Sequence, residues 1–261
     1  MESSAAQRYI AEFVGTFFLL VGVTGAALVT LQSVTVGGYI PSLGISIAIG
    51  LVLAVSIYAL GDVSGGHFNP AVTIAMLLSR RMPMRDAVPY IVAQVVGALV
   101  GVFAVAAWAH GSPAGWNTMV TTSFASQGYS ANNGYLYSLS SVFFFEVVAT
   151  FLFLFIILRV TRPDSGVKNL APLTIGFALL MVNLIGIGID GASFNPARSF
   201  APAIVSQIWP PATGAWALGQ SWVFWLAPIV GAVLAAVVEM AVFSPKKTSA
   251  PTAGASSDPR V

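Results

Sequence analysis

The stretch Gly191-Ala-Ser-Phe-Asn-Pro-Ala-Arg-Ser-Phe-Ala-Pro202 places an arginine directly behind an Asn-Pro pair in a chain that is otherwise poor in charge. Asn195 is a favoured helix N-cap, and Pro196 suits the first helical position, where its missing N–H removes no hydrogen bond. A helix is therefore predicted from Pro196 to about Val205, before Trp209-Pro-Pro211. Its length is about 15 Å, which is half of a bilayer core of about 30 Å.

A second stretch, Ser64-Gly-Gly-His-Phe-Asn-Pro-Ala-Val-Thr73, has the same design. It predicts another half-length helix, which begins after Asn69 and fades near Ser79. Two half-helices that enter from opposite sides would meet tip to tip at the membrane midplane. Broken helices in corresponding positions of a repeated membrane protein indicate a central binding or conduction site.

The composition places the chain in a membrane. Of its 261 residues, 57% are hydrophobic and only 8% are charged, whereas about a quarter are charged in soluble domains. The chain has no cysteine, and its two histidines lie in different segments, so the sequence predicts no disulfide, metal site or other cofactor. The basic residues are scattered rather than gathered in one patch, which argues against a nucleic-acid partner.

Six apolar runs are long enough to cross a bilayer, which takes about 17 to 25 residues; they are 9–31, 41–60, 87–109, 136–160, 170–189 and 221–243. The first run is expected to be retained rather than cleaved as a signal, because it is too long, contains Glu12 and recurs in the second half. The predicted organisation is an N-terminal segment 1–8, a channel domain 9–243 and a disordered tail 244–261.

Lysine and arginine set the orientation. Ten of the eleven lie in connections that six spans bring to one side of the membrane, which predicts a multi-pass protein of the cell membrane with both termini in the cytoplasm. The eleventh is Arg198, on the outer side. A charge at membrane depth usually faces a water-filled cavity. The ten are Arg8, Arg80, Arg81, Arg85, Arg159, Arg162, Lys168, Lys246, Lys247 and Arg260.

The chain repeats itself. Glu12-Phe-Val-Gly-Thr-Phe resembles Glu146-Val-Val-Ala-Thr-Phe at an offset of 134, and Asn69-Pro-Ala71 matches Asn195-Pro-Ala197 at an offset of 126. The repeats, about 9–110 and 136–243, each hold three spans and a half-helix, and an odd number of spans forces opposite orientations. The predicted fold is an all-α membrane protein with six transmembrane helices and two re-entrant half-helices in an inverted repeat.

Over about 8–243, these features resemble the aquaporin, or major intrinsic protein, family. The resemblance is carried by Asn69, Pro70 and Ala71, by Asn195, Pro196 and Ala197, by the trailing Arg198 and by the repeated Glu-x-x-x-Thr-Phe. It implies a homotetramer whose subunits each hold a pore that conducts water passively and excludes protons and ions. If Asn69 and Asn195 cap their helices through the side-chain oxygen, their NH2 groups stay free to donate into the pore. Half-helix dipoles and an arginine are known selectivity devices in such channels.

The resemblance also implies a narrow filter at Ile49, Asn183, Ala192 and Arg198. Water-selective members of the family typically have an aromatic residue and a histidine at the first two positions, so the smaller residues here predict a wider constriction. Other positions resemble the water-channel branch; they are Ser199, Ala203 and Phe224-Trp225. The prediction is a water channel with small neutral solutes as further candidates. The alternative is a facilitator mainly for glycerol, urea, ammonia or hydrogen peroxide.

Several residues have a second interpretation. Arg198 could be an anchor for backbone carbonyls, Asn183 could bond to a neighbouring helix, and Ile49 would also suit the lipid face. Glu12 and Glu146 are predicted to support the irregular backbone before each half-helix; a proton-coupled transporter would use them as a relay.

His67 is predicted to be held in its loop rather than to act as a pH gate, and the sequence leaves the partners of Asp62 and Asp190 open. A structural adhesion role is the other competing class. No nucleophile, base and orienting residue can be assembled from these motifs, so no enzymatic activity is expected.

Overall fold

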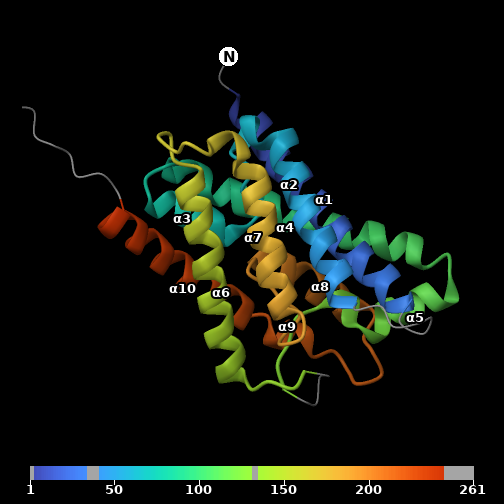
Figure 1. Ribbon diagram of the computed structural model, residues 1–261. Helices are drawn as coiled ribbons and strands as arrows, with labels where there is room; N and C mark the ends of the chain where they lie inside the picture. Colours follow the sequence, from blue (N-terminus) through green and yellow to red (C-terminus); the bar gives the residue numbers. More distant parts are fainter. Residues whose placement is uncertain (1–2, 34–40, 131–134, 244–261) are drawn as a thin grey trace, which may run out of the picture.

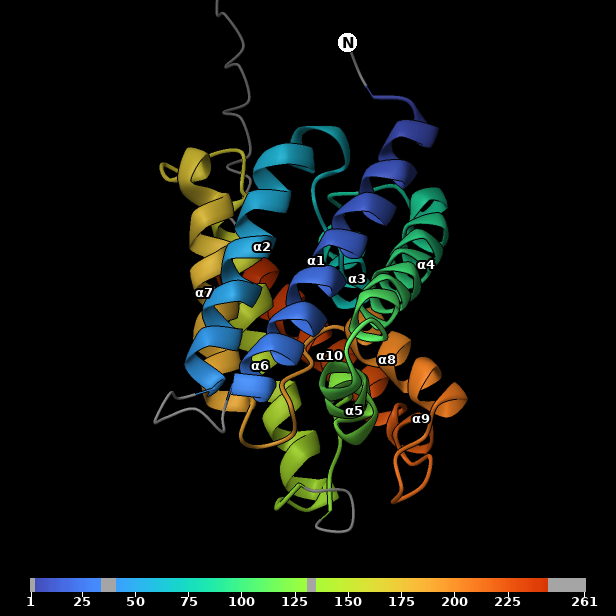
Figure 2. The same cartoon turned by 90° about the vertical axis from the view of Figure 1, so that its right-hand side faces the viewer.

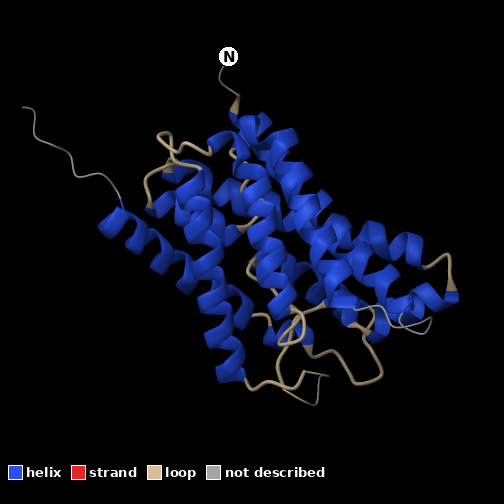
Figure 3. Cartoon of the chain, viewed as in Figure 1, coloured by secondary structure: helices blue, strands red, loops and turns tan. Residues whose placement is uncertain are grey.

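The computed structural model describes residues 3–33, 41–130 and 135–243, and all regular elements in these ranges are helices (Figure 3). The long helices are α1 (Ala5–Ser33), α2 (Pro41–Ser64), α4 (Met84–Ala109), α6 (Leu139–Val160), α7 (Ala171–Gly186) and α10 (Val223–Val238), which continues as the π-helix η5 (Glu239–Phe243). The short elements are α3 (Pro70–Leu78), α5 (Pro113–Thr121), η2 (Ser123–Ala125), η4 (Lys168–Leu170), α8 (Pro196–Ile208) and α9 (Ala217–Gln220).

The predicted membrane fold is confirmed. Within the described ranges, six helices are long and apolar enough to cross a membrane. Some bounds differ from the prediction: the first span begins at Ala5, and the half-helix α8 extends to Ile208. Helix α5, which Ser112 caps through its side chain, lies in an outer connection where no helix was predicted. The predicted tail 244–261, with Lys246, Lys247 and Arg260, lies outside the described residues.

The helices form a bundle around the two short helices α3 and α8. The main packed pairs are α1 with α4, α2 with α7, α6 with α10, and α1 with α2. Helix α3 lies nearer the end of the molecule that carries the N-terminus, and α8 lies nearer the opposite end (Figures 1 and 2). We refer to these ends as the N-terminal face and the opposite face.

Glycines allow the long helices to cross closely. A Cβ atom on Gly97 of α4 would lie 2.3 Å from the carbonyl oxygen of Phe13 in α1, and one on Gly231 of α10 would lie 2.6 Å from that of Val147 in α6. These distances are too short for a real Cβ atom, so the helices can cross this closely only where the residue is glycine. The two crossings are related by the internal repeat.

We expect Gly97→Ala to destabilise the protein, because the added methyl group meets backbone rather than a movable side chain. Overpacking of this kind costs about 1–3 kcal/mol. Thermal unfolding in detergent measures the loss. Gly219→Ala is the matched control, since a Cβ there meets nothing within 4 Å. Equal unfolding temperatures for the two variants would contradict the close crossing.

Arginines on the N-terminal face are paired with acidic residues. Arg81, Arg159 and Arg162 contact the buried carboxylate of Glu239 at 3.2, 3.8 and 3.2 Å. Arg162 also donates to both oxygens of Asp164, at 2.8 and 2.9 Å, and this contact holds the pKa of the Asp164 carboxyl below its usual range. The basic side chains on this face therefore also tie the ends of α3, α6 and α10 together.

Candidate pore and filter

Each half-helix begins at an asparagine N-cap. The Asn69 Oδ1 accepts a hydrogen bond from the Ala71 N–H at 2.8 Å, and the Asn195 Oδ1 accepts from the Ala197 N–H at 3.0 Å. In both helices proline occupies the first turn, where its missing N–H leaves no bond unmade. The two helix N-termini therefore bring positive partial charge to one point in the interior.

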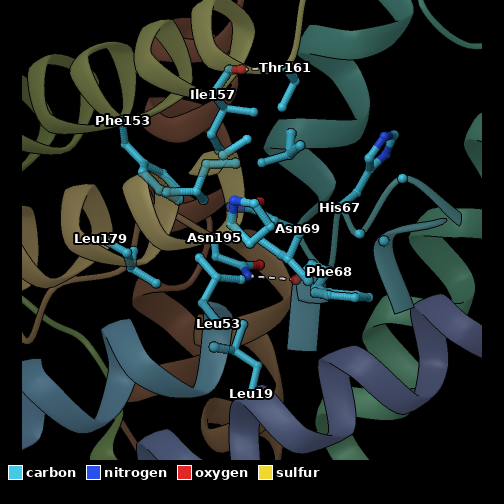
Figure 4. A pocket seen from close by; sticks show the side chains of 18 of the residues that line it. Leu19, Leu53, His67, Phe68, Asn69, Phe153, Ile157, Thr161, Leu179 and Asn195 are labelled. Atoms are coloured by element: carbon cyan, nitrogen blue, oxygen red, sulfur yellow. Dashed lines mark hydrogen bonds between the residues drawn. The ribbon is translucent and has the colours of Figure 1, made fainter. Parts of the chain in front are cut away.

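The tips of the half-helices are joined by a pair of reciprocal hydrogen bonds. The Asn69 Nδ2 donates to the Phe194 carbonyl at 2.8 Å. The Asn195 Nδ2 donates to the Phe68 carbonyl at 2.9 Å, a bond that Figure 4 shows as a dashed line. Phe68 and Phe194 have positive φ angles of 49° and 54°. The expectation that both amide groups stay entirely free is therefore wrong for one N–H of each. An amide has two N–H donors, so the second of each remains for the cavity that both residues line.

Glu12 holds the loop before the first half-helix. Its fully buried carboxylate accepts hydrogen bonds from Ser64 Oγ at 2.7 Å, His67 N at 2.9 Å, Phe68 N at 2.7 Å and Gln94 Nε2 at 2.8 Å. A carboxylate has about four acceptor positions, so these donors satisfy it. Such bonds satisfy backbone N–H groups that find no water at membrane depth.

Glu146 has the corresponding position in the second repeat. It is also fully buried and accepts from Ser193 N at 2.7 Å and Phe194 N at 2.9 Å. Asp190, whose partner the sequence left open, accepts from Ala192 N through Oδ1 at 2.8 Å. The filter loop, which we define as residues 190–194, is therefore held by two carboxyl groups.

Two cavities meet at Arg198. One, of about 420 Å³, extends inward from η4 at the N-terminal face and is lined by Asn69, Asn195 and Arg198. Figure 4 shows Asn69 and Asn195 among its lining side chains. The other, of about 410 Å³, lies toward the opposite face and is lined by Arg198 and Trp216 among others. Arg198 therefore stands at the boundary between them, where a filter would have to be.

The four residues expected at the filter do not all line a cavity. Ile49 is 3% exposed and lines the first cavity, so it is not on the lipid face. Asn183 lines the same cavity and donates from Nδ2 to the Leu179 carbonyl of its own helix at 2.9 Å, which leaves its Oδ1 as an acceptor. Ala192 is buried in the filter loop and lines neither cavity.

Arg198 lines both cavities, and its guanidinium is also held by two backbone carbonyls. Its Nη1 donates to the Ala125 carbonyl at 2.9 Å, and its Nη2 donates to the Gly191 carbonyl at 3.2 Å. The two interpretations of this arginine are therefore compatible. Sequence reasoning missed Ala125, because a backbone acceptor in an uncharged connection has no side-chain signature.

His67 is fixed within the first loop. Its Nδ1 lies 3.2 Å from the Thr73 Oγ1, and its ring packs against Tyr90 with the centroids 5.2 Å apart. The side chain is buried and also lines the first cavity. Within the described ranges, no group of three histidine or acidic side chains is placed to hold a metal ion.

Residues 1–239 match the family described as Major intrinsic protein. The chain belongs to this family. Among curated members, it is 40% identical to Aquaporin Z of Rhodopseudomonas palustris, with 92% of this chain and 95% of that protein covered. It is 41% identical to Glycerol uptake facilitator protein-like 6 of Lactiplantibacillus plantarum, with coverage of 88% and 95%.

A solved structure has the same fold. The aquaglyceroporin from Plasmodium falciparum matches with a TM-score of 0.75 and 25% identity, over 92% of this chain and 97% of that one. The chain is thus an integral membrane protein with the fold of the major intrinsic protein family, and members that resemble it have both aquaporin and glycerol-facilitator names.

Proposed function

We propose that this protein is a passive channel that conducts water and also passes small neutral solutes such as glycerol, urea, ammonia or hydrogen peroxide. The observation that carries the proposal is the meeting of two cavities at Arg198, beside Ile49 and Asn183. Resemblance to an aquaporin supports water as a substrate, and resemblance to a glycerol facilitator supports the neutral solutes. A facilitator mainly for those solutes is the second candidate.

Exclusion of ions follows from the charge around the path. The guanidinium of Arg198 and the N-termini of α3 and α8 all direct positive charge at the pore, which repels cations. A water at the tips would accept from the free N–H groups of Asn69 and Asn195, with its own hydrogens turned outward. That orientation interrupts a continuous chain of donated hydrogen bonds, so protons are also excluded.

The proposed filter combines an apolar wall with polar groups. Ile49 provides a wall without the bulk of an aromatic ring, Asn183 provides an acceptor oxygen, and Arg198 provides donors. A solute with hydroxyl or amide groups replaces its water bonds with these contacts while its carbon face rests against Ile49. We assign Ala192 to the same filter through its backbone, since it joins Gly191, the acceptor of Arg198, to the rest of the loop.

The proposal also covers the bounds of the channel domain, its orientation in the membrane and its assembly. Residues 9–243 are the channel domain, with repeats of about 9–110 and 136–243. The protein lies in the cell membrane. Its N-terminal face, which carries the clustered arginines, is on the cytoplasmic side. Exposed apolar side chains such as Leu51 and Val55 are suited to lipid or to three further copies in a homotetramer. Transport needs no cofactor and no catalytic step.

Ile49→Phe tests the filter. We expect glycerol permeability to fall by at least about tenfold, and water permeability to fall less. One extra methylene group in a closely fitted pocket already changes the preference between two substrates by about tenfold or more, and the phenyl ring narrows the passage further. Stopped-flow light scattering of proteoliposomes measures both. Ile47→Phe is the matched control, since Ile47 lies on the same helix but is 40% exposed. Equal effects of the two substitutions would argue against a filter at Ile49.

A further inference from the structure

The two buried glutamates have corresponding contacts in the two repeats. Glu12 accepts from the backbone N–H groups of His67 and Phe68, and Glu146 accepts from those of Ser193 and Phe194. His67 and Phe68 are separated from Ser193 and Phe194 by the offset of 126 found in the sequence. The repeats can therefore be compared atom by atom at these sites.

The second site lacks both side-chain donors of the first. Glu12 also accepts from Ser64 Oγ and Gln94 Nε2. At the same offset of 126, Ser64 corresponds to Asp190, and at the offset of 134 Gln94 corresponds to Pro228. Proline donates no hydrogen bond, and a carboxylate is an acceptor only. A hydroxyl donor has thus been replaced by a second acid.

Asp190 and Glu146 are neighbouring acids in one buried site. Their carboxyl groups hold adjacent backbone N–H groups of the filter loop, those of Ala192 and of Ser193 and Phe194, and both residues are 0% exposed. The Asp190 Oδ2 has no hydrogen-bond donor among the described residues. Two carboxylates that share a buried site cannot both be ionised. A hydrogen bond between these groups requires a proton on one of them.

The surrounding charges also fit a pair with a single proton. Arg198 of α8 is the charged group that faces the pair, and the hydroxyl of Tyr135, which donates to the Ser126 carbonyl, lies near the arginine. Helices α3, α7 and α10, which pack against α6, carry no titratable side chain. The π-helix η5 also packs against α6, and its Glu239 is paired with three arginines at the N-terminal face. One carboxylate and one carboxylic acid balance the charge of Arg198, whereas two carboxylates would leave an excess negative charge in the membrane.

We propose that Asp190 and Glu146 share one proton, and that this proton positions the filter loop for Arg198. The proposal rests on the proposed filter. Asp190 holds Ala192 N, Glu146 holds Ser193 N and Phe194 N, and the Gly191 carbonyl between them holds Arg198. When rising pH removes the proton, the two carboxylates repel each other and displace the loop and the acceptor of Arg198. Asp190 is thus a positioning residue that makes solute selectivity depend on pH.

Infrared spectroscopy of the purified protein, in a detergent without ester groups, tests the shared proton without any transport. We expect a carbonyl stretching band of a protonated carboxylic acid in the wild type at neutral pH. We expect the band to disappear in Asp190→Asn, because the amide N–H of asparagine can donate to Glu146 without any titratable proton. We expect it to persist in Asp164→Asn, which alters an exposed carboxylate. Absence of the band from the wild type, which needs no variant to fold, would overturn the proposal. Persistence in Asp190→Asn would do so as well.

The pH profile of selectivity tests the positioning role. The ratio of glycerol to water permeability should change as pH is raised in the wild type and should stay constant in Asp190→Asn and in Asp190→Ser, which restores the residue of the first repeat. A constant ratio in the wild type, or the wild-type profile in Asp190→Asn, would overturn this role. Failure of the proposed function would be distinguishable, because neither solute would then cross faster than in empty liposomes while the infrared band remained.

Discussion

Arg198→Ala should admit cations and protons to the pore and should raise glycerol passage. The guanidinium is the positive side chain at the meeting of the two cavities. At about 4 Å and an effective dielectric constant of about 20, a unit charge repels a cation by about 4 kcal/mol. Its removal therefore raises cation permeability by up to about a thousandfold. The smaller side chain also widens the passage.

Proteoliposomes loaded with a pH-sensitive dye report the proton flux, and light scattering reports glycerol. Arg198→Lys separates charge from shape, because lysine keeps the charge but lacks the fork that reaches two carbonyls; it should retain cation exclusion. Arg80→Ala removes an exposed arginine and serves as the control. Unchanged selectivity in Arg198→Ala would contradict the filter assignment.

Glu12→Ala should prevent most of the protein molecules from folding. The substitution leaves Ser64 Oγ, the N–H groups of His67 and Phe68, and Gln94 Nε2 without their acceptor in a buried site. Each unsatisfied donor costs about 1–3 kcal/mol, so the four together cost about 4–12 kcal/mol. That loss is comparable to the whole stability of many proteins, about 5–15 kcal/mol.

Thermal unfolding and size-exclusion profiles in detergent measure this effect. Glu12→Gln keeps one acceptor oxygen and should lie between the wild type and the alanine variant. Wild-type thermal stability of Glu12→Ala would show that the loop does not depend on the carboxylate.

Much of the fold was predictable because a membrane constrains sequence strongly. Long apolar runs predicted the six spans, and the Asn-Pro pairs predicted the starts of α3 and α8, since capping and the first-turn proline are local effects. The helix α5 was missed. Its capping serine and first-turn proline are the same kind of local signal, but its short sequence lacks a long apolar run.

The contacts between the repeats could not be predicted in the same way. The reciprocal bonds of Asn69 and Asn195 depend on how two loops from distant parts of the chain approach each other. The carbonyl that holds Arg198 comes from Ala125, where any residue would supply the same atom. The internal offset aligns Asp190 with Ser64, but only the structure shows that Asp190 and Glu146 hold the same loop.

Stopped-flow light scattering of proteoliposomes, challenged in parallel with an impermeant osmolyte and with glycerol, tests the central claim most directly. A channel for water and small neutral solutes predicts shrinkage much faster than in liposomes without protein, followed in glycerol by rapid reswelling. Shrinkage and reswelling at the rates of empty liposomes would contradict the proposed channel.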